Sequence, residues 1–197
     1  MLLTDRRVLH SLVAAVAGVT LVCVVDSTAW VHRPFMGFLL GRNRIVAPNA
    51  LAHWTGFRAG VPFGAELIAV DGRPVGEVAD LVEETWARSV GTPVRYTFMT
   101  PGGRIERTVP VMRFTLADYI SLFGVWLVNG VVFLVLGFVV AYLKPGRPAS
   151  AAMFVFCAAW GLMMVVSMGD FYRFHFRSLY AVAQAVAPGA LLMLALT

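Results

Sequence analysis

The residues that could carry out chemistry in this sequence are few and scattered. The four histidines are His10, His32, His53 and His175, and none belongs to a His-Glu-x-x-His motif of the kind that binds zinc in hydrolases. Ser167 and Gly169 come closest to a serine nucleophile motif, but without a facing histidine they are typical of a helix end. Glu83 and Glu84 are neighbours on an expected solvated helix face. We therefore predict no catalytic residue, metal or cofactor, and any enzyme activity would lie beyond residue 197.

The cysteines and the net charge argue against other classes of function. Cys23 and Cys157 both lie in long apolar segments, so they are expected to be buried apolar residues rather than a disulfide or a metal pair. The formal charge is +5, yet no lysine-rich run alternates with aromatic residues as in proteins that follow a phosphate backbone. Nucleic acid is therefore not an expected partner.

The composition points instead to the lipid bilayer. Hydrophobic residues make up 59% of the chain, charged residues 14%, and the mean hydropathy is +0.76, whereas soluble domains are roughly half apolar and about a quarter charged. A membrane-spanning helix needs about 20 mostly apolar residues. Four segments come near this length: 8–25, 119–143, 149–168 and 179–196. We expect a polytopic α-helical membrane protein.

Small and polar residues within these segments predict how the helices pack. Cys157 and Gly161 are four residues apart, as are Ala181, Ala185 and Gly189, and such spacing favours close helix contact. The same signals allow a homodimer through the transmembrane helices. The amides Asn129 and Gln184 are expected to hydrogen-bond to neighbouring helices.

Between the first two apolar segments the pattern becomes that of a small water-exposed fold. Short strands are expected at 38–40, 44–47, 67–70, 94–99 and 105–111, separated by glycine and proline turns. One amphipathic helix is expected at 77–90, with Glu84 and Arg88 four residues apart as an ion pair. The sequence Asp71-Gly72 predicts a tight turn between two strands.

This order of elements resembles a PDZ domain. The resemblance is carried by Ala59-Gly60-Val61 and by Ile68-Ala69-Val70-Asp71-Gly72-Arg73-Pro74-Val75, and it extends over about 80 of the 197 residues. It departs from the family at Gly64-Ala65, where Gly-Asp is usual. The fold class implied is a four-helix membrane protein with an inserted small α+β PDZ-like domain.

The resemblance also implies a binding site. PDZ domains take up the C-terminus of another protein as an added strand, with the carboxylate held by the backbone amides of a hydrophobic-Gly-hydrophobic loop. Phe35-Met36-Gly37-Phe38 is similar to that loop, and Leu81 and Thr85 would line the groove. Phe35, Met36 and Phe38 could equally be core or membrane-interface residues.

The basic residues beside the apolar segments predict the topology. Arg6 and Arg7 precede the first segment, and Lys144 and Arg147 connect the second and third, so both sites are expected in the cytoplasm. Arg173 and Arg177, before the last segment, count against this orientation. The predicted domains are 1–28, a cytoplasmic N-terminus and first span, which could instead be a cleaved signal peptide; 29–114, an extracytoplasmic PDZ-like domain; and 115–197, three further spans of an inner-membrane protein.

This arrangement resembles the sensory input region of membrane histidine kinases in bacteria. We expect the outer domain to bind a peptide or protein C-terminus and to signal through the helices to a cytoplasmic effector following residue 197. The alternative is a non-enzymatic membrane scaffold or protease-associated adaptor, in which the helices only anchor the domain.

Overall fold

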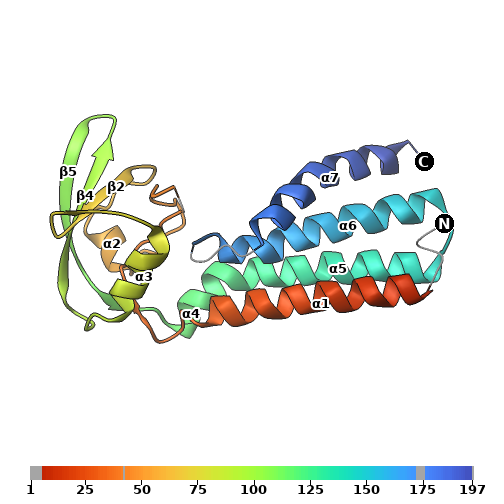
Figure 1. Ribbon diagram of the computed structural model, residues 1–197, viewed down its shortest axis with the longest axis horizontal. Helices are drawn as coiled ribbons and strands as arrows, with labels where there is room; N and C mark the ends of the chain where they lie inside the picture. Colours follow the sequence, from red (N-terminus) through yellow and green to blue (C-terminus); the bar gives the residue numbers. More distant parts are fainter. Residues whose placement is uncertain (1–5, 42, 172–175, 197) are drawn as a thin grey trace. The chain divides into compact units, whose positions relative to one another are not determined.

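The computed structural model describes residues 6–41, 43–171 and 176–196 (Figure 1). The chain divides into a helical unit, made of residues 1–27, 123–169 and 174–197, and a mixed unit, made of residues 28–122 and 170–173. Residues 115–122, which the sequence assigns to the spans, fall in the mixed unit, and residues 116–122 also belong to a stretch apolar enough to cross a membrane. Arg173, which entered the topology prediction, and His175, one of the four histidines, lie outside the described residues.

The helical unit contains four long helices, which confirms the predicted number of apolar segments. They are α1 (Arg6–Thr28), α5 (Val125–Leu143), α6 (Pro148–Val166) and α7 (Arg177–Ala195). Among the described residues, four stretches are long and apolar enough to cross a membrane: His10–Thr28, Leu116–Leu143, Pro148–Val166 and Arg177–Ala195. The second includes α4 (Leu116–Tyr119) and a π-helical turn, η2 (Ile120–Gly124). A short 3-10 helix, η3 (Ser167–Phe171), follows α6.

Glycines bring α5 and α6 into backbone contact. A Cβ at Gly161 would lie 2.7 Å from the Gly130 carbonyl oxygen, and a Cβ at Gly137 would lie 2.8 Å from the Cβ of Cys157. Cys157 is fully buried and unpaired. The predicted contact through Cys157 and Gly161 is thus confirmed.

The face by which α7 packs differs from the prediction. Ala183 and Ala187 are buried with Ala159 of α6, whereas Ala181, Ala185 and Gly189 are exposed. Residues four apart recur on two faces of this alanine-rich helix, so local spacing could not identify the face that meets α6.

The two amides also differ from the expectation of contacts between helices. Asn129 Nδ2 donates to the Val125 carbonyl in its own helix at 3.0 Å, and Gln184 is exposed. A carbonyl one turn earlier is within reach of a helical amide side chain, so this bond needs no neighbouring helix.

The mixed unit is built on small antiparallel sheets. One sheet has the order β3-β2-β4-β5, formed by β2 (Glu66–Val70), β3 (Arg73–Pro74), β4 (Pro93–Thr100) and β5 (Gly103–Pro110). A second pairs β1 (Pro34–Phe35) with β6 (Met112–Arg113). The helices of this unit are α2 (Thr55–Arg58), α3 (Val78–Trp86) and α4. The β1–β6 sheet therefore joins segments from both ends of the mixed unit.

Several local predictions for this unit are confirmed. Asp71 and Gly72 have φ values of 48° and 80°, as a tight turn with two left-handed central residues requires, and they connect β2 to β3. Val94, Tyr96 and Phe98 are buried on β4. The predicted helix 77–90 is shorter than expected and ends at Trp86, ahead of Gly91, whose φ is 91°.

The segments 38–40 and 44–47 do not form regular strands. They meet at the single bridge between Leu40 and Val46, and a second bridge joins Ile45 to Glu66. A tight turn separates them, in which the Arg44 amide donates to the Gly41 carbonyl and Arg44 has a φ of 64°.

Aromatic rings hold together the two ends of the mixed unit. Trp30, near its start, lies 5.9 Å from Phe35 and 5.9 Å from Phe114 between ring centroids. Trp86, at the end of α3, lies 6.2 Å from Trp30, and Trp54 lies 4.8 Å from Phe35. Edge-to-face pairs of this kind favour a fixed geometry, so we call these five rings the aromatic cluster.

Candidate peptide-binding site

The loop of residues 35–38 is shaped by β1 and by α2. Phe35 ends β1, paired with Met112 of β6, and the chain then turns at Gly37 with a φ of 83°. The Gly37 carbonyl accepts a hydrogen bond from the Gly56 amide at 3.1 Å. A left-handed φ is readily adopted by glycine, which explains its place in this loop.

All six residues predicted for the site are buried. Phe35, Met36 and Phe38 are 1–2% exposed, Leu81 is 6% exposed, Thr85 is 2% exposed, and Gly37 is buried as well. The Thr85 hydroxyl donates to the Leu81 carbonyl in its own helix at 2.8 Å. The side chains therefore belong to the core in this structure, and a peptide would reach them only after the loop or α3 moved.

The backbone of segment 38–40 nevertheless has the geometry of a free strand edge. Its inner side is paired, because the Ala47 amide donates to the Leu39 carbonyl and the Gly41 amide donates to the Ile45 carbonyl. Alternate residues of an antiparallel strand direct their polar groups to opposite sides. Across the part of the chain that the structure describes, the amides of Phe38 and Leu40 have no hydrogen-bond acceptor. These are the groups that an added strand would pair with.

Thr55, at the start of α2, carries an unsatisfied hydroxyl beside this loop. Its Oγ1 is buried without a hydrogen-bond partner among the described residues, while its amide contacts Met112 Sδ at 3.4 Å. A Cβ at Gly37 would overlap this oxygen. Leaving a buried hydroxyl unpaired costs about 1–3 kcal/mol, so the closed loop is held at an energetic cost.

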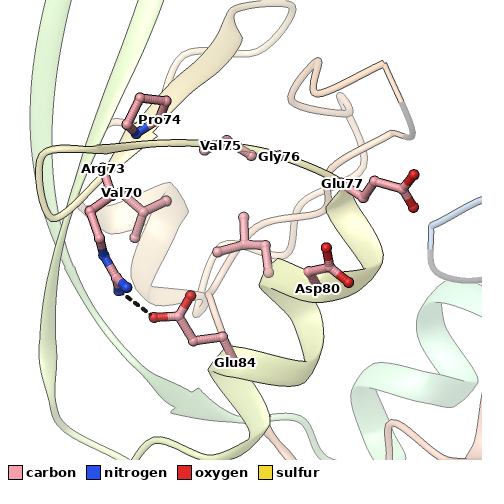
Figure 2. Close-up of a pocket in the computed structure, with 9 residues that line it drawn as sticks. Val70, Arg73, Pro74, Val75, Gly76, Glu77, Asp80 and Glu84 are labelled. Carbon is pink, nitrogen blue, oxygen red and sulfur yellow. Dashed lines mark hydrogen bonds and ion pairs between the residues drawn. The ribbon is translucent and has the colours of Figure 1, made fainter.

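A separate pocket lies between the β2–β3 turn and α3 (Figure 2). It has a volume of about 190 Å³, and its lining residues are Val70, Arg73, Pro74, Val75, Gly76, Glu77, Asp80, Leu81 and Glu84. The Arg73 side chain lies along the wall of the pocket, and its guanidinium donates to Glu84 Oε1 at 2.7 Å, as Figure 2 shows. Ligand pockets usually measure about 300–1,000 Å³, so this one has room for a single side chain. Of the six predicted residues, it is lined by Leu81 alone.

Asp71 joins the β2–β3 turn to β4 and to the segment that follows α3. Its carboxylate accepts from the Arg95 amide at 3.0 Å and from Arg88 at 2.9 Å. Burial acts to raise the pKa of Asp71, but these two donors outweigh it and the pKa is lowered. The predicted pair of Glu84 and Arg88 is confirmed at 3.0 Å, and Arg88, helped by Arg73, lowers the pKa of Glu84 against the effect of burial.

A buried carboxylate that sequence reasoning missed lies at Asp118. It is 0% exposed and accepts from Trp54 Nε1 at 2.8 Å, from His53 Nε2 at 2.7 Å, and from the Thr115 amide at 2.7 Å and hydroxyl at 2.6 Å. Thr115 and Asp118 form a reciprocal cap at the start of α4. Their spacing, Thr-x-x-Asp, is a visible cap signal, whereas nothing local indicates a partner 64 or 65 residues away.

Within residues 6–41, 43–171 and 176–196 no group of three or more histidine, cysteine, aspartate or glutamate side chains could hold a metal ion. Among the described residues, the carboxylate of the His53–Asp118 pair also accepts hydrogen bonds from Trp54 and from Thr115, the residue that caps α4.

Comparison with known proteins leaves the family open. No model of a known protein family matches the chain, and no curated protein matches it. Among solved structures, a serine endoprotease from Yersinia pestis is similar to part of it, with a TM-score of 0.37 and 17% sequence identity. The match covers 42% of this chain and 29% of the endoprotease chain. A likeness of this size supports neither a shared fold nor a shared activity.

Proposed function

We propose that the mixed unit is an extracytoplasmic PDZ-like domain that binds the C-terminus of a peptide or protein. In this proposal the helical unit lies in the inner membrane and passes the bound state to a cytoplasmic effector, such as a histidine kinase. The unpaired backbone edge at 38–40 supports the binding step, because main-chain pairing is how an added strand gains affinity.

The observation that carries the signalling step is the pairing of the two ends of the mixed unit. The His32 amide donates to the Phe114 carbonyl at 2.7 Å, and the Phe114 amide donates to the Arg33 carbonyl at 3.0 Å. With the β1–β6 pair, these bonds join the segment after α1 to the segment before α4. In the proposed sensor, these bonds transmit a change at one end of the unit to the other.

The aromatic cluster extends this connection to the proposed groove. Trp86 belongs to α3, the helix that carries Leu81 and Thr85, and its ring contacts Trp30. The Arg33 guanidinium lies 5.1 Å from the centroid of Trp86. Because a ligand beside α3 would displace this helix, we propose that it shifts Trp30 and with it both paired ends.

The binding step predicts that a free carboxylate matters. We would test hexapeptides from a random library against the full chain in lipid nanodiscs, comparing each binder with its C-terminal amide by fluorescence polarisation. Amidation is expected to weaken binding at least about tenfold, since hydrogen bonds to a charged group contribute about 1.5–3 kcal/mol. Equal affinity for the two forms would exclude the loop 35–38 as the carboxylate site.

The same samples separate a sensor from a scaffold or protease-associated adaptor. If the domain signals, peptide binding should change hydrogen exchange at residues 28–35 and 112–122 as well as at the groove. A scaffold would bind the peptide without a change in hydrogen exchange at residues 28–35 and 112–122. Protection confined to residues 36–40 and 78–86 would therefore favour the scaffold.

The proposed topology makes a prediction about the side of the membrane. A reporter that is active only outside the cytoplasm, fused after Trp86, should be active in cells. The expected control is the same reporter fused after Lys144, in the connection between α5 and α6, which should be inactive. The reverse result would place the mixed unit in the cytoplasm and remove the basis for an extracytoplasmic sensor.

A further inference from the structure

We propose that the Thr55 hydroxyl biases the loop 35–38 toward an open form that accepts ligand. It would do so because the closed loop leaves this hydroxyl unpaired, and opening gives it a partner. The inference rests on the proposed peptide-binding function and assigns a positioning role to a residue outside the six predicted from the sequence.

The first step is the environment of the hydroxyl in the closed loop. Thr55 Oγ1 is buried and unpartnered within the described part of the chain. It lies against the Cα of Gly37, on the side where any other residue would carry its Cβ. A carbon–hydrogen group on this side cannot replace a strong hydrogen-bond acceptor.

The second step is that the hydrogen bond between the loop 35–38 and α2 does not involve the Thr55 hydroxyl. The nearby Gly37 carbonyl is already paired with the Gly56 amide at 3.1 Å, so this bond fixes the loop beside α2 without using the hydroxyl. Thr55 is the first residue of a helix of four residues, and Trp54 before it provides no side-chain cap. The closed arrangement therefore pairs the Gly56 amide with the Gly37 carbonyl and leaves the hydroxyl out.

The third step is that ligand binding requires this loop to move. Because residues 35–38 are buried, a carboxylate can reach their amides only if the loop separates from its neighbours. Separation of Gly37 from α2 would uncover Thr55 Oγ1 to solvent or to the ligand. The apparent affinity of a protein that must open first is reduced by the fraction that is closed. A group that destabilises the closed form therefore raises affinity.

The test compares Thr55→Val, which removes the hydroxyl and keeps the shape, with Thr55→Ser, which keeps the hydroxyl. In the full chain in nanodiscs without peptide, Thr55→Val should raise the melting temperature and slow amide exchange at residues 36–38 about tenfold. For a carboxylate-ended hexapeptide from the library above, it should weaken affinity about tenfold. Thr55→Ser should stay within about twofold of the parent chain. Thr108→Val, at an exposed threonine on β5, is the matched control and should change none of these three quantities.

The outcomes distinguish this inference from the proposed function. Unchanged exchange at 36–38 in Thr55→Val would overturn the inference even if no peptide were found, because the loop equilibrium is measured directly. A higher melting temperature with unchanged peptide affinity would also overturn it and leave peptide binding intact. If the parent chain bound carboxylate and amide peptides equally, the proposed function would fail, while slower exchange in Thr55→Val would still support the loop bias.

Discussion

Replacing Gly37 by alanine should destabilise the mixed unit by about 3 kcal/mol or more. Gly37 has a φ of 83°, where a residue with a Cβ is strained by about 1–2 kcal/mol. The new methyl group would also overlap Thr55 Oγ1 and lie 2.7 Å from the Gly56 amide nitrogen, which is backbone and cannot rotate away. Overpacking adds about 1–3 kcal/mol. Thermal unfolding of the full chain in nanodiscs, followed by tryptophan fluorescence, would measure the effect.

Gly64→Ala is the matched control for this prediction. Gly64 has a φ of 76°, close to that of Gly37, but a Cβ there would meet no heavy atom within 4 Å. It should therefore show the backbone strain of about 1–2 kcal/mol without the overlap. If both variants lost the same stability, the close approach of α2 to the loop 35–38 would not exist in solution.

Asp118→Ala should cost about 3–5 kcal/mol, the other large effect. The carboxylate is inaccessible to solvent, and its loss leaves Trp54 Nε1 buried without an acceptor and removes one half of the reciprocal cap of α4. Deleting one member of a buried charged network is strongly destabilising, because a buried partner such as Trp54 cannot form a replacement hydrogen bond with water. Unfolding should be followed as for Gly37→Ala, with hydrogen exchange at residues 51–54 and 115–119 expected to rise together.

Two further variants divide this effect among the partners of Asp118. His53→Ala should cost less than about 1.5 kcal/mol, because the His53 side chain is 55% exposed and water replaces its bond. Asp80→Ala, an exposed carboxylate on α3, should stay within about 0.5 kcal/mol of the parent chain. A cost for Asp118→Ala no larger than for Asp80→Ala would contradict the network.

Local patterns were sufficient for the elements themselves. Continuous apolar runs predicted four long helices, alternation predicted β4, and Asp71-Gly72 predicted the turn between β2 and β3. Each of these signals arises within a few residues of the chain, since helix and strand periodicities are properties of neighbouring positions. The same patterns could not say whether Ala181 or Ala183 would face α6, because both positions repeat with helical spacing.

The sequence by itself determined that this protein has four apolar helices with a small sheet-containing insertion, because those features depend on short-range periodicity. Only the tertiary structure decided that the loop 35–38 is closed, that Thr55 lies behind Gly37, and that Asp118 is bound by Trp54 and His53. These contacts join residues between 18 and 65 positions apart in the chain. Their formation depends on how the elements pack, which no local pattern encodes.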